Sequence, residues 1–240
     1  MRHKVLFIFG ELNLWLVPKQ PQTLNVQNNL RRRLNLNQAM DYYLQRLPRV
    51  MQHVADLLDD RGYEGFPFSE ATDAPVLGLS KGCSIGEAIS CVVKHRVTGA
   101  NLHVCFLDPL FDVVKNKEIM TSSYQLHGLL TDLPSTAQCL VITYAKLSPD
   151  ASNEASKLKK RMQVLTFKQL AFSLGKHVLV PKHVALSSAE ALEFEESRKL
   201  QRNKLPHLKQ SDPVRIWYGW PKGTIVRIER PTGVIWRCVH

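Results

Sequence analysis

The spacing of apolar residues predicts a helix in the first quarter of the chain. From Met40 onward, apolar side chains recur at alternating steps of three and four residues, which is the period of one helical face. They are Leu44, Leu47, Met51, Val54 and Leu58. Pro48 predicts that the helix starts near Leu47 or is kinked there, and Gly62 is a natural end. The apolar face is typical of core packing.

The chain before Met40 has a different character. Residues 18–38 are rich in Gln, Asn and Pro, include three consecutive arginines, and show little regular apolar spacing. Such a composition is typical of a flexible extension. The apolar stretch over residues 5–17 is interrupted by an acidic side chain and is too short to span a bilayer, so no membrane partner is expected.

Helical signals and short apolar runs alternate in the middle of the chain. Ser84 stands three residues before Glu87, a capping box that predicts the start of a helix. The buried face predicted for this helix comprises Ile85, Ala88, Ile89, Val92 and Val93. Residues 102–107 form a compact apolar run that predicts a buried strand, and residues 112–114 are candidates to pair with it.

Two more helices and a second buried strand are expected next. A helix is predicted around residues 123–130, and the continuous apolar run over residues 139–144 is typical of a strand covered on both faces. Ser148 and Pro149 can open another helix, because the first amide of a helix has no partner. Helices that alternate with buried strands indicate an α/β domain.

The last third of the chain predicts a second, smaller module. A short strand is expected over residues 177–180, closed by a proline. Ser187 with Glu190 forms another capping box, which predicts a helix that reaches about Lys199. Glu195 and Lys199 are spaced as a favourable ion pair on that helix.

Turn residues divide the rest of this module. Residues 203–213 form an irregular connection in which Asp212 is expected to initiate a turn, and residues 220–223 fit a type I turn. The strand that follows places Val226 and Ile228 on one face and Arg227 and Glu229 on the other. Residues 230–233 then turn the chain into a last strand over residues 234–239. These elements predict a small α+β module with a mostly antiparallel sheet.

Positive charge is concentrated in the last third of the chain. The formal net charge is +11, and residues 151–240 contribute +10 of it, from 17 basic and 7 acidic side chains. Such a distribution indicates a polyanion or an acidic surface as partner, with nucleic acid as the first candidate and a solvated basic face as the alternative. The same two interpretations apply to one cluster, proposed as DNA-proximal: Lys157, Lys159, Lys160 and Arg161.

The cysteines and histidines show no spacing that predicts a metal site or a set of disulfides. The five cysteines include no CxxC pair, and their odd number indicates a reducing compartment. His177 and His183 stand six residues apart, but no Cys or carboxylate is close to them in sequence, whereas zinc takes four ligands. A structural role is therefore favoured for both histidines, and no metal or cofactor is expected.

The C-terminal module carries an ordered set of residues that matches a known family. The set comprises His177, Leu179, Val180, Pro181, His183, Leu205, Pro206, Asp212, Pro213, Val214, Tyr218, Gly219, Gly223, Arg230 and Pro231. In order and spacing it resembles the C-terminal domain of the fifth subunit shared by eukaryotic RNA polymerases I, II and III, which has a counterpart in archaeal RNA polymerase. Upstream, residues 60–63 resemble the start of the jaw domain of that family.

This resemblance implies an α+β protein in three parts. Residues 1–39 would be a flexible extension, residues 40–174 an α/β jaw domain with a degenerate restriction-endonuclease-like fold, and residues 175–240 an assembly domain. The implied function is that of a non-catalytic subunit of a nuclear RNA polymerase, docked on the largest subunit beside downstream double-stranded DNA. The matching residues, Val214 aside, are the expected subunit interface. The implied location is the nucleus, or the nucleolus if the chain serves RNA polymerase I alone.

The chain also departs from the family pattern. His207 and Leu208 stand where the family usually has Arg and Ile, and residues 215–217 read Arg-Ile-Trp where Ala-Arg-Tyr is usual. The turn after Arg230 and Pro231 is shorter than usual. These differences indicate a divergent member or a paralogue.

Two other functions are compatible with the residues. A stand-alone basic nucleic-acid-binding protein could stack bases on Trp217, Tyr218 and Trp220, although such aromatics are also typical of cores and subunit interfaces. A metal-dependent nuclease would need paired carboxylates ahead of a lysine. Lys146 has no acidic residue two positions before it, so neither catalysis nor a small-molecule substrate is expected.

Overall fold

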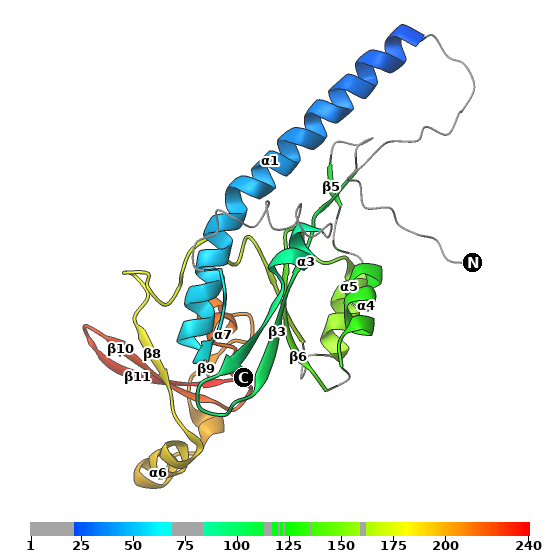
Figure 1. Ribbon diagram of the computed structural model, residues 1–240. Helices are drawn as coiled ribbons and strands as arrows, with labels where there is room; N and C mark the ends of the chain where they lie inside the picture. Colours follow the sequence, from blue (N-terminus) through cyan, green and yellow to red (C-terminus); the bar gives the residue numbers. More distant parts are fainter. Residues whose placement is uncertain are drawn as a thin grey trace. The chain divides into compact units, whose positions relative to one another are not determined.

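The protein is described by a computed structural model, shown in Figure 1. It describes residues 22–68, 84–112, 117–119, 121, 123–134, 136–158 and 162–240, with backbone alone for residues 22–39, 110–112, 117–119, 123, 124, 130 and 132. The chain divides into two compact units. Unit 1 comprises Met1–Pro48, Glu70–Cys91 and Leu102–Phe167, and unit 2 comprises Arg49–Ser69, Val92–Asn101 and Lys168–His240. Unit 2 therefore draws on three separate stretches of sequence.

The first helix, α1, spans Gln22–Asp60 and contributes to both units. Its predicted apolar face is confirmed, because Leu47, Met51, Val54 and Leu58 are all buried. The helix starts at Gln22, far earlier than predicted, so a start near Leu47 is wrong. The flexible extension over residues 1–39 stays a prediction. No Gly or Pro interrupts residues 22–47, and good helix formers such as Leu, Arg and Gln are frequent there.

Three parallel strands form the centre of unit 1. Strands β3 (Asn101–Leu107) and β7 (Met162–Thr166) flank β6 (Gln138–Thr143), and both pair with it in parallel. Helices α4 (Ser123–Asp132) and α5 (Pro149–Lys157) lie side by side against these strands (Figure 1). Leu126 of α4 and Ala151 of α5 pack on Cys139, Val141 and Met162 of the strands. The two predicted strands and the two helices are confirmed.

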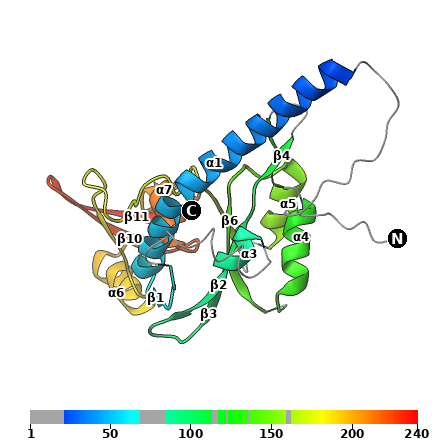
Figure 2. The same cartoon turned by 45° about the horizontal axis from the view of Figure 1, so that its top comes forward.

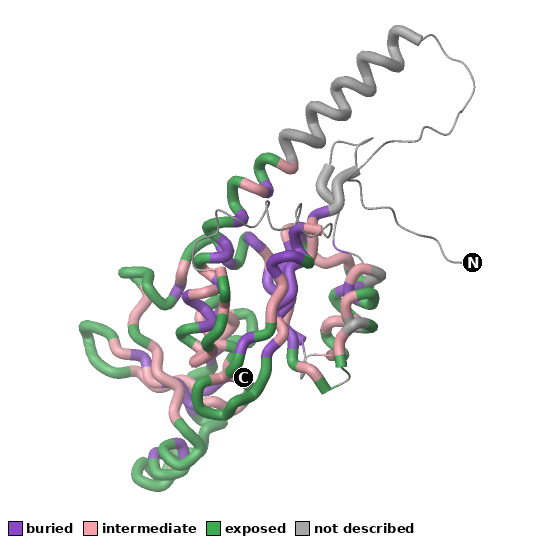
Figure 3. Tube along the Cα trace, viewed as in Figure 1, coloured by how far each residue is buried: buried purple, intermediate pink, exposed green. Residues whose placement is uncertain are grey.

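Burial explains why the apolar runs of unit 1 become strands. Figure 3 shows buried positions concentrated along β3 and β6, and five of the six residues of β6 are buried. Strands covered on both faces need continuous apolar sequence, which residues 139–143 supply. Ser148 caps α5 and accepts a hydrogen bond from the Ala151 amide at 3.2 Å, as the Ser-Pro sequence predicts.

Two details of unit 1 differ from prediction. Helix α3 spans only Ile85–Ile89, so Val92 and Val93 belong to strand β2 (Cys91–His95) and not to the helix face. The helix ends because Ser90 leaves the helical conformation, and its amide and its hydroxyl both donate to the Gly86 carbonyl, at 3.0 and 2.7 Å. Strand β4 (Leu110–Asp112) pairs with β5 (Lys117–Ile119), so Asp112 does not pair with β3. Residues 113 and 114 lie outside the described residues.

Unit 2 contains a four-stranded sheet in the order β8-β10-β11-β9. Strands β8 (Lys182–Ala185), β10 (Ile225–Arg230) and β11 (Gly233–Val239) are antiparallel, and β9 (His207–Leu208) pairs in parallel with β11. The mostly antiparallel sheet is therefore as predicted. Figure 2 shows the β10–β11 hairpin from a second direction. A short antiparallel pair, β1 (Tyr63–Glu64) with β2, also contributes to unit 2.

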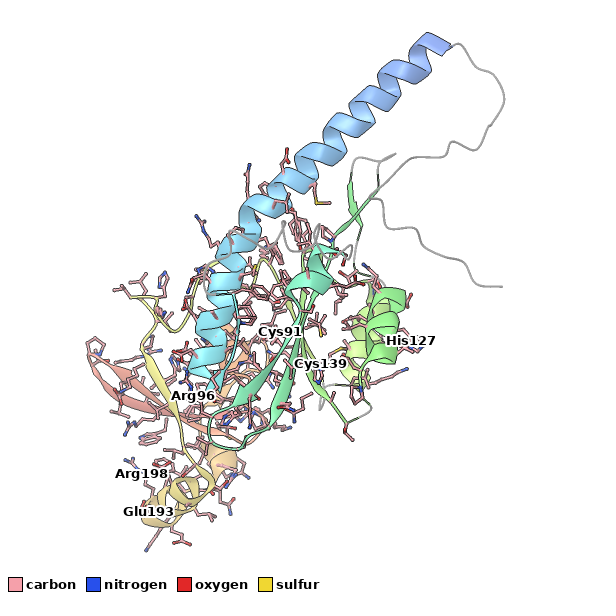
Figure 4. All side chains as sticks on the ribbon, in the orientation of Figure 1. Cys91, Arg96, His127, Cys139, Glu193 and Arg198 are labelled. Carbon is pink, nitrogen blue, oxygen red and sulfur yellow. The ribbon has the colours of Figure 1, made fainter. Side chains whose placement is uncertain are left out.

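Each face of the four-stranded sheet has its own apolar cluster. Helix α6 (Ser188–Arg198) packs Ala191 and Phe194 against one face, together with Leu205, Ile225 and Cys238. Arg198 of α6, labelled in Figure 4, lies over the Phe194 ring at 5.1 Å from its centre. Leu208, Val226, Ile228 and Val239 form the cluster on the other face. Alternation along β10 thus places neighbouring residues in different cores, as its sequence predicts.

Several local predictions for unit 2 need correction. Residues 177–180 form a turn, and the strand starts after Pro181 because proline cannot donate to a sheet. Glu195 pairs with Arg202 at 2.6 Å, whereas Lys199 ends α6 in the left-handed conformation. The turn predicted at residues 220–223 lies one residue later, with a Thr224 amide that donates to the Pro221 carbonyl at 3.3 Å.

The described residues thus form a mixed α and β protein with sheets in both units. The restriction-endonuclease-like character of the jaw segment and the domain boundaries near residues 39 and 174 stay predictions. In the part of the chain that the structure describes, no helix is long and apolar enough to cross a membrane. Cys91, Cys105, Cys139 and Cys238 are free thiols.

Candidate subunit interface

All fourteen residues predicted to form the interface lie in unit 2, but they do not form one patch. Seven are exposed: His177, Leu179, Pro206, Pro213, Gly219, Arg230 and Pro231. Leu205 is buried in the apolar cluster under α6, and the remaining six are partly buried. The family pattern therefore combines residues that build the fold with residues that are free to contact another chain.

Two of the most exposed large apolar side chains of unit 2 lie in the turn over residues 177–180. Val178 is 97% exposed and Leu179 is 84% exposed. The Val180 amide donates to the His177 carbonyl at 2.9 Å, and the Leu179 amide donates to His177 Nδ1 at 3.3 Å. These bonds hold the turn and direct two adjacent aliphatic side chains to solvent. Phe172, half exposed, lies beside the His177 ring at a centroid distance of 5.6 Å.

His183 lies on the sheet at the start of β8. Its Nδ1 is 2.6 Å from the Pro181 carbonyl oxygen, which can only accept, so Nδ1 carries the hydrogen. Burial lowers the pKa of His183, and the positive charges of Arg230 and Arg237 lower it further, against the raising effects of the Pro181 hydrogen bond and Asp212. The imidazole is therefore neutral at pH 7 and has a structural role.

A short helix, α7 (Pro213–Tyr218), follows directly from the Asp-Pro pair of the family pattern. Asp212 caps it, because its carboxylate accepts hydrogen bonds from the Val214 and Arg215 amides at 2.9 and 3.4 Å. The predicted turn at Asp212 is thus the first turn of a helix. Gly219 ends α7 in the left-handed conformation with φ of 70°, which favours glycine.

The end of α1 holds α7 in place, a connection that the sequence patterns did not reveal. Arg61 donates from Nε to the Trp217 carbonyl at 2.7 Å and from Nη2 to the Ile216 carbonyl at 2.9 Å. Trp217, which is buried, donates its indole hydrogen to Asp60 Oδ2 at 2.7 Å. Burial lowers the pKa of Arg61 to about 10, so the side chain stays charged at neutral pH.

The same part of α1 contacts the segment just before the exposed turn. His53 Nδ1 lies 2.8 Å from the Leu170 carbonyl oxygen, and Lys176 donates to Asp56 at 2.6 Å. Burial tends to raise the pKa of Asp56, but hydrogen bonds from Lys176 and Ser173 outweigh it and lower the pKa overall. We call the contacts of His53, Asp56, Asp60 and Arg61 the α1 seam. It fixes both α7 and the base of the turn.

The remaining predicted residues shape the hairpin and its flank. Tyr218 stacks on Trp220 with ring centres 4.6 Å apart, and burial raises the pKa of the Tyr218 phenol. Gly223, with φ of 89°, allows the tight turn before β10. Arg230 pairs with Gly233, which confirms the predicted turn between the last two strands. The aromatics therefore contribute to the fold of this unit.

The structure describes only one member of the predicted DNA-proximal cluster. Lys157, in unit 1, is exposed and is the last residue of α5. Lys159, Lys160 and Arg161 lie outside the described residues. In the described ranges, no group of three or more His, Cys, Asp or Glu side chains could hold a metal ion.

Comparison with known proteins agrees with the C-terminal fold. Residues 172–239 match the family described as RNA polymerase Rpb5, C-terminal domain. This range includes β8 to β11, α6 and α7, together with all fourteen predicted interface residues.

Three relatives carry the name of a shared RNA polymerase subunit. Subunit RPABC1 of DNA-directed RNA polymerases I, II and III from Dictyostelium discoideum is 30% identical over 99 residues, which are 40% of this chain and 50% of the relative. RPABC1 from Caenorhabditis briggsae is 26% identical over 200 residues, 78% of this chain and 90% of the relative. RPABC1 from Caenorhabditis elegans is 26% identical over 98 residues, 40% of this chain and 46% of the relative.

The extent of these matches differs. The chain spans about half of the length of the Dictyostelium discoideum and Caenorhabditis elegans relatives, and nearly all of the Caenorhabditis briggsae one. The C-terminal domain is the part that the family match defines. Residues 172–239 are therefore similar to the RNA polymerase Rpb5 C-terminal domain.

Proposed function

We propose that the chain is a non-catalytic structural subunit of a nuclear DNA-dependent RNA polymerase, docked on the largest subunit through the exposed turn at residues 177–180. The relatives are named as subunits of RNA polymerases I, II and III, and one of them matches over 78% of this chain. The observation that carries the docking proposal is the exposure of Val178 and Leu179 within the Rpb5-type domain.

Exposure of these two side chains has an energetic cost that a partner would remove. A buried aliphatic side chain gains roughly 1.5–3 kcal/mol relative to water. The backbone bonds of the turn and the Lys176–Asp56 pair at its base already hold the conformation, so little flexibility is lost on binding. A preorganised apolar projection is a common anchor of protein interfaces.

The proposal has two further parts, a role for the jaw segment and a location in the cell. The segment over residues 40–174 would serve as the jaw domain, with Lys157 and the basic residues after it near downstream double-stranded DNA. An exposed lysine at the end of α5 is compatible with a phosphate contact. The protein would be nuclear, and nucleolar if it serves RNA polymerase I alone.

Affinity purification of the tagged full-length chain tests this function. The largest polymerase subunit is expected among the recovered proteins, and the identity of that subunit reports which polymerase contains the chain. Recovery of no polymerase subunit would refute the proposal. In that case a steep fall of DNA affinity with salt would favour a stand-alone nucleic-acid-binding protein.

A matched pair of variants tests the docking turn. Val178→Asp places a charge in the proposed contact and should reduce recovery of the largest subunit at least tenfold, because burial of an unpaired carboxylate is costly. Val97→Asp is the control, since Val97 is 88% exposed in unit 2 but lies outside the turn. Equal recovery by both variants would show that the turn does not dock.

A further inference from the structure

Basic and imidazole side chains gather at the β9 edge of the four-stranded sheet. We infer that this edge is a binding site for single-stranded nucleic acid, in which bases stack on imidazole and phosphates contact lysine and arginine. We call it the basic edge, and it comprises Lys204, His207, Lys209, Lys222, Arg237 and His240. The site is separate from the docking turn and goes beyond the proposed structural function.

Two stacked histidines form the centre of the basic edge. The rings of His207 and His240 are nearly parallel, with an angle of 8° between their planes and 4.1 Å between their centres. Both residues are exposed. Backbone pairing fixes their positions, because His207 lies opposite Cys238 in the sheet and the His240 amide donates to the Leu208 carbonyl at 3.0 Å. The pair offers a preformed aromatic surface to solvent.

Cationic groups are brought to this surface by the fold. Arg237 donates from Nη1 to the His207 carbonyl at 3.1 Å, which places its guanidinium beside the histidine pair. The Gly223 amide donates to the Val239 carbonyl at 2.8 Å, so the turn that carries Lys222 lies against the end of β11. Lys222 is exposed.

Acidic side chains are absent from the three sequence segments that form the basic edge. Residues 199–211, 219–224 and 235–240 contain no Asp or Glu. The carboxylate of Glu195, from α6, approaches this region but is paired with Arg202 at 2.6 Å. Lys204 and Lys209 are exposed and flank His207 in sequence. Asp212 directly follows the first of these segments and caps α7. The excess of positive charge over these segments indicates a polyanionic ligand.

The stacked imidazoles favour single-stranded nucleic acid over an acidic peptide or a duplex as the ligand. An acidic peptide would use the lysines but would gain little from a flat aromatic surface, whereas every nucleobase has a face that can stack. Bases within a duplex are already stacked on each other, so a single strand can use both features and a duplex only the charges.

Binding of fluorescein-labelled oligonucleotides to the purified full-length chain tests the inference. Fluorescence anisotropy would be measured with a 20-nucleotide oligo-uridine, an oligo-thymidine of equal length, a 20-base-pair DNA duplex and a polyglutamate peptide. We expect either single strand to bind at least tenfold more tightly than the duplex or the peptide. The ratio between the two single strands reports whether RNA or DNA is preferred.

Two sets of variants separate charge from stacking. Combined Lys204→Gln, Lys209→Gln and Lys222→Gln should weaken binding about ten- to a hundredfold at about 0.1 M salt, and lower the salt slope by about 2. The control combines Lys94→Gln, Lys146→Gln and Lys168→Gln, which changes the net charge equally at exposed lysines elsewhere. His207→Ala should weaken binding about tenfold, and His207→Phe should restore most of it, because phenylalanine also stacks.

Clear outcomes would overturn the inference. Equal loss in the two triple variants would mean that net charge alone drives binding, and tighter binding of duplex or peptide would assign the edge to another polyanion. Equal affinity of His207→Ala and the unmodified chain would exclude stacking. None of these results bears on docking at the turn, which is tested by recovery of the polymerase.

Discussion

Replacement of Arg61 by methionine tests the α1 seam most directly. The side chain makes two hydrogen bonds, to the Trp217 and Ile216 carbonyls at 2.7 and 2.9 Å. These carbonyls lie at the end of α7, where a positive charge is also favoured by the helix dipole. Methionine keeps much of the apolar stem but donates no hydrogen bond, so both carbonyls lose their partner.

The expected loss of stability follows from the bonds that are removed. A hydrogen bond that involves a charged group contributes about 1.5–3 kcal/mol, and a partly exposed site lies at the low end of that range. Two such bonds, which are not fully additive, give about 2–3 kcal/mol for Arg61→Met. Arg61→Lys can keep one bond at most and should lose about half as much.

Urea unfolding followed by tryptophan fluorescence provides the measurement. Three of the four tryptophans of the chain, Trp217, Trp220 and Trp236, lie in unit 2, so the signal reports on the relevant part. Arg49→Met is the control, because Arg49 is an exposed arginine of the same helix. A change below about 0.5 kcal/mol for Arg61→Met, within the range of ordinary surface substitutions, would refute the importance of the seam.

Three further predictions concern single positions of the fold. Gly219→Ala should cost about 1–3 kcal/mol, because φ is 70° and the new Cβ would lie 3.2 Å from the Arg61 guanidinium, whereas Gly128→Ala in α4 should be neutral or stabilising by thermal unfolding. Ser187→Ala should cost about 1 kcal/mol through loss of the α6 cap, and Ser188→Ala, one residue later, should cost almost nothing in the same assay. Because the pKa of His183 is lowered in the folded chain, this imidazole binds a proton more readily in the unfolded chain as pH falls through about 6.5. Stability should therefore drop from pH 7.5 to 5.5, and His183→Gln should show a smaller drop in urea titrations at the two pH values.

Local signals in the sequence predicted much of the structure, because they depend on nearby residues. The capping boxes at Ser84 and Ser187 mark true helix starts, since each serine satisfies an amide three residues later. The alternation along β10 also predicted that Val226 and Ile228 share one buried face. These features need no knowledge of distant parts of the chain.

Features that depend on distant residues were not predictable in this way. The α1 seam joins residues that are between 117 and 157 positions apart, and Asp60 and Arg61 have no local pattern that indicates their partners. The turn at residues 177–180 was interpreted as a strand because Val-Leu-Val is typical of strands. Exposure of Val178 and Leu179 is the reverse of what apolar sequence predicts, and it is the feature that led to the docking proposal.

The exposure of the predicted interface residues was also not predictable from the sequence. Sequence comparison grouped Leu205, a core residue, with Leu179, an exposed one, because both fit the family pattern. Only the structure distinguishes a residue that maintains the fold from a residue that is free to bind. The basic edge was missed for a related reason: His207 and His240 are far apart in sequence and meet through the pairing of β9 with β11.

The α1 seam also sets an order of events during synthesis. Arg61 is made 156 residues before Trp217, its bonding partner, which at about 5–20 residues per second corresponds to roughly 8–30 s of translation. During that interval Asp60 and Arg61 lack the groups of α7 that they bond in the folded chain. A chain that stops at residue 171 would leave Arg61 and Asp60 permanently unpaired, and a fragment that starts at residue 172 would lack the groups that hold α7. Expression of the two pieces from one vector should therefore yield more folded domain than expression of the C-terminal piece alone.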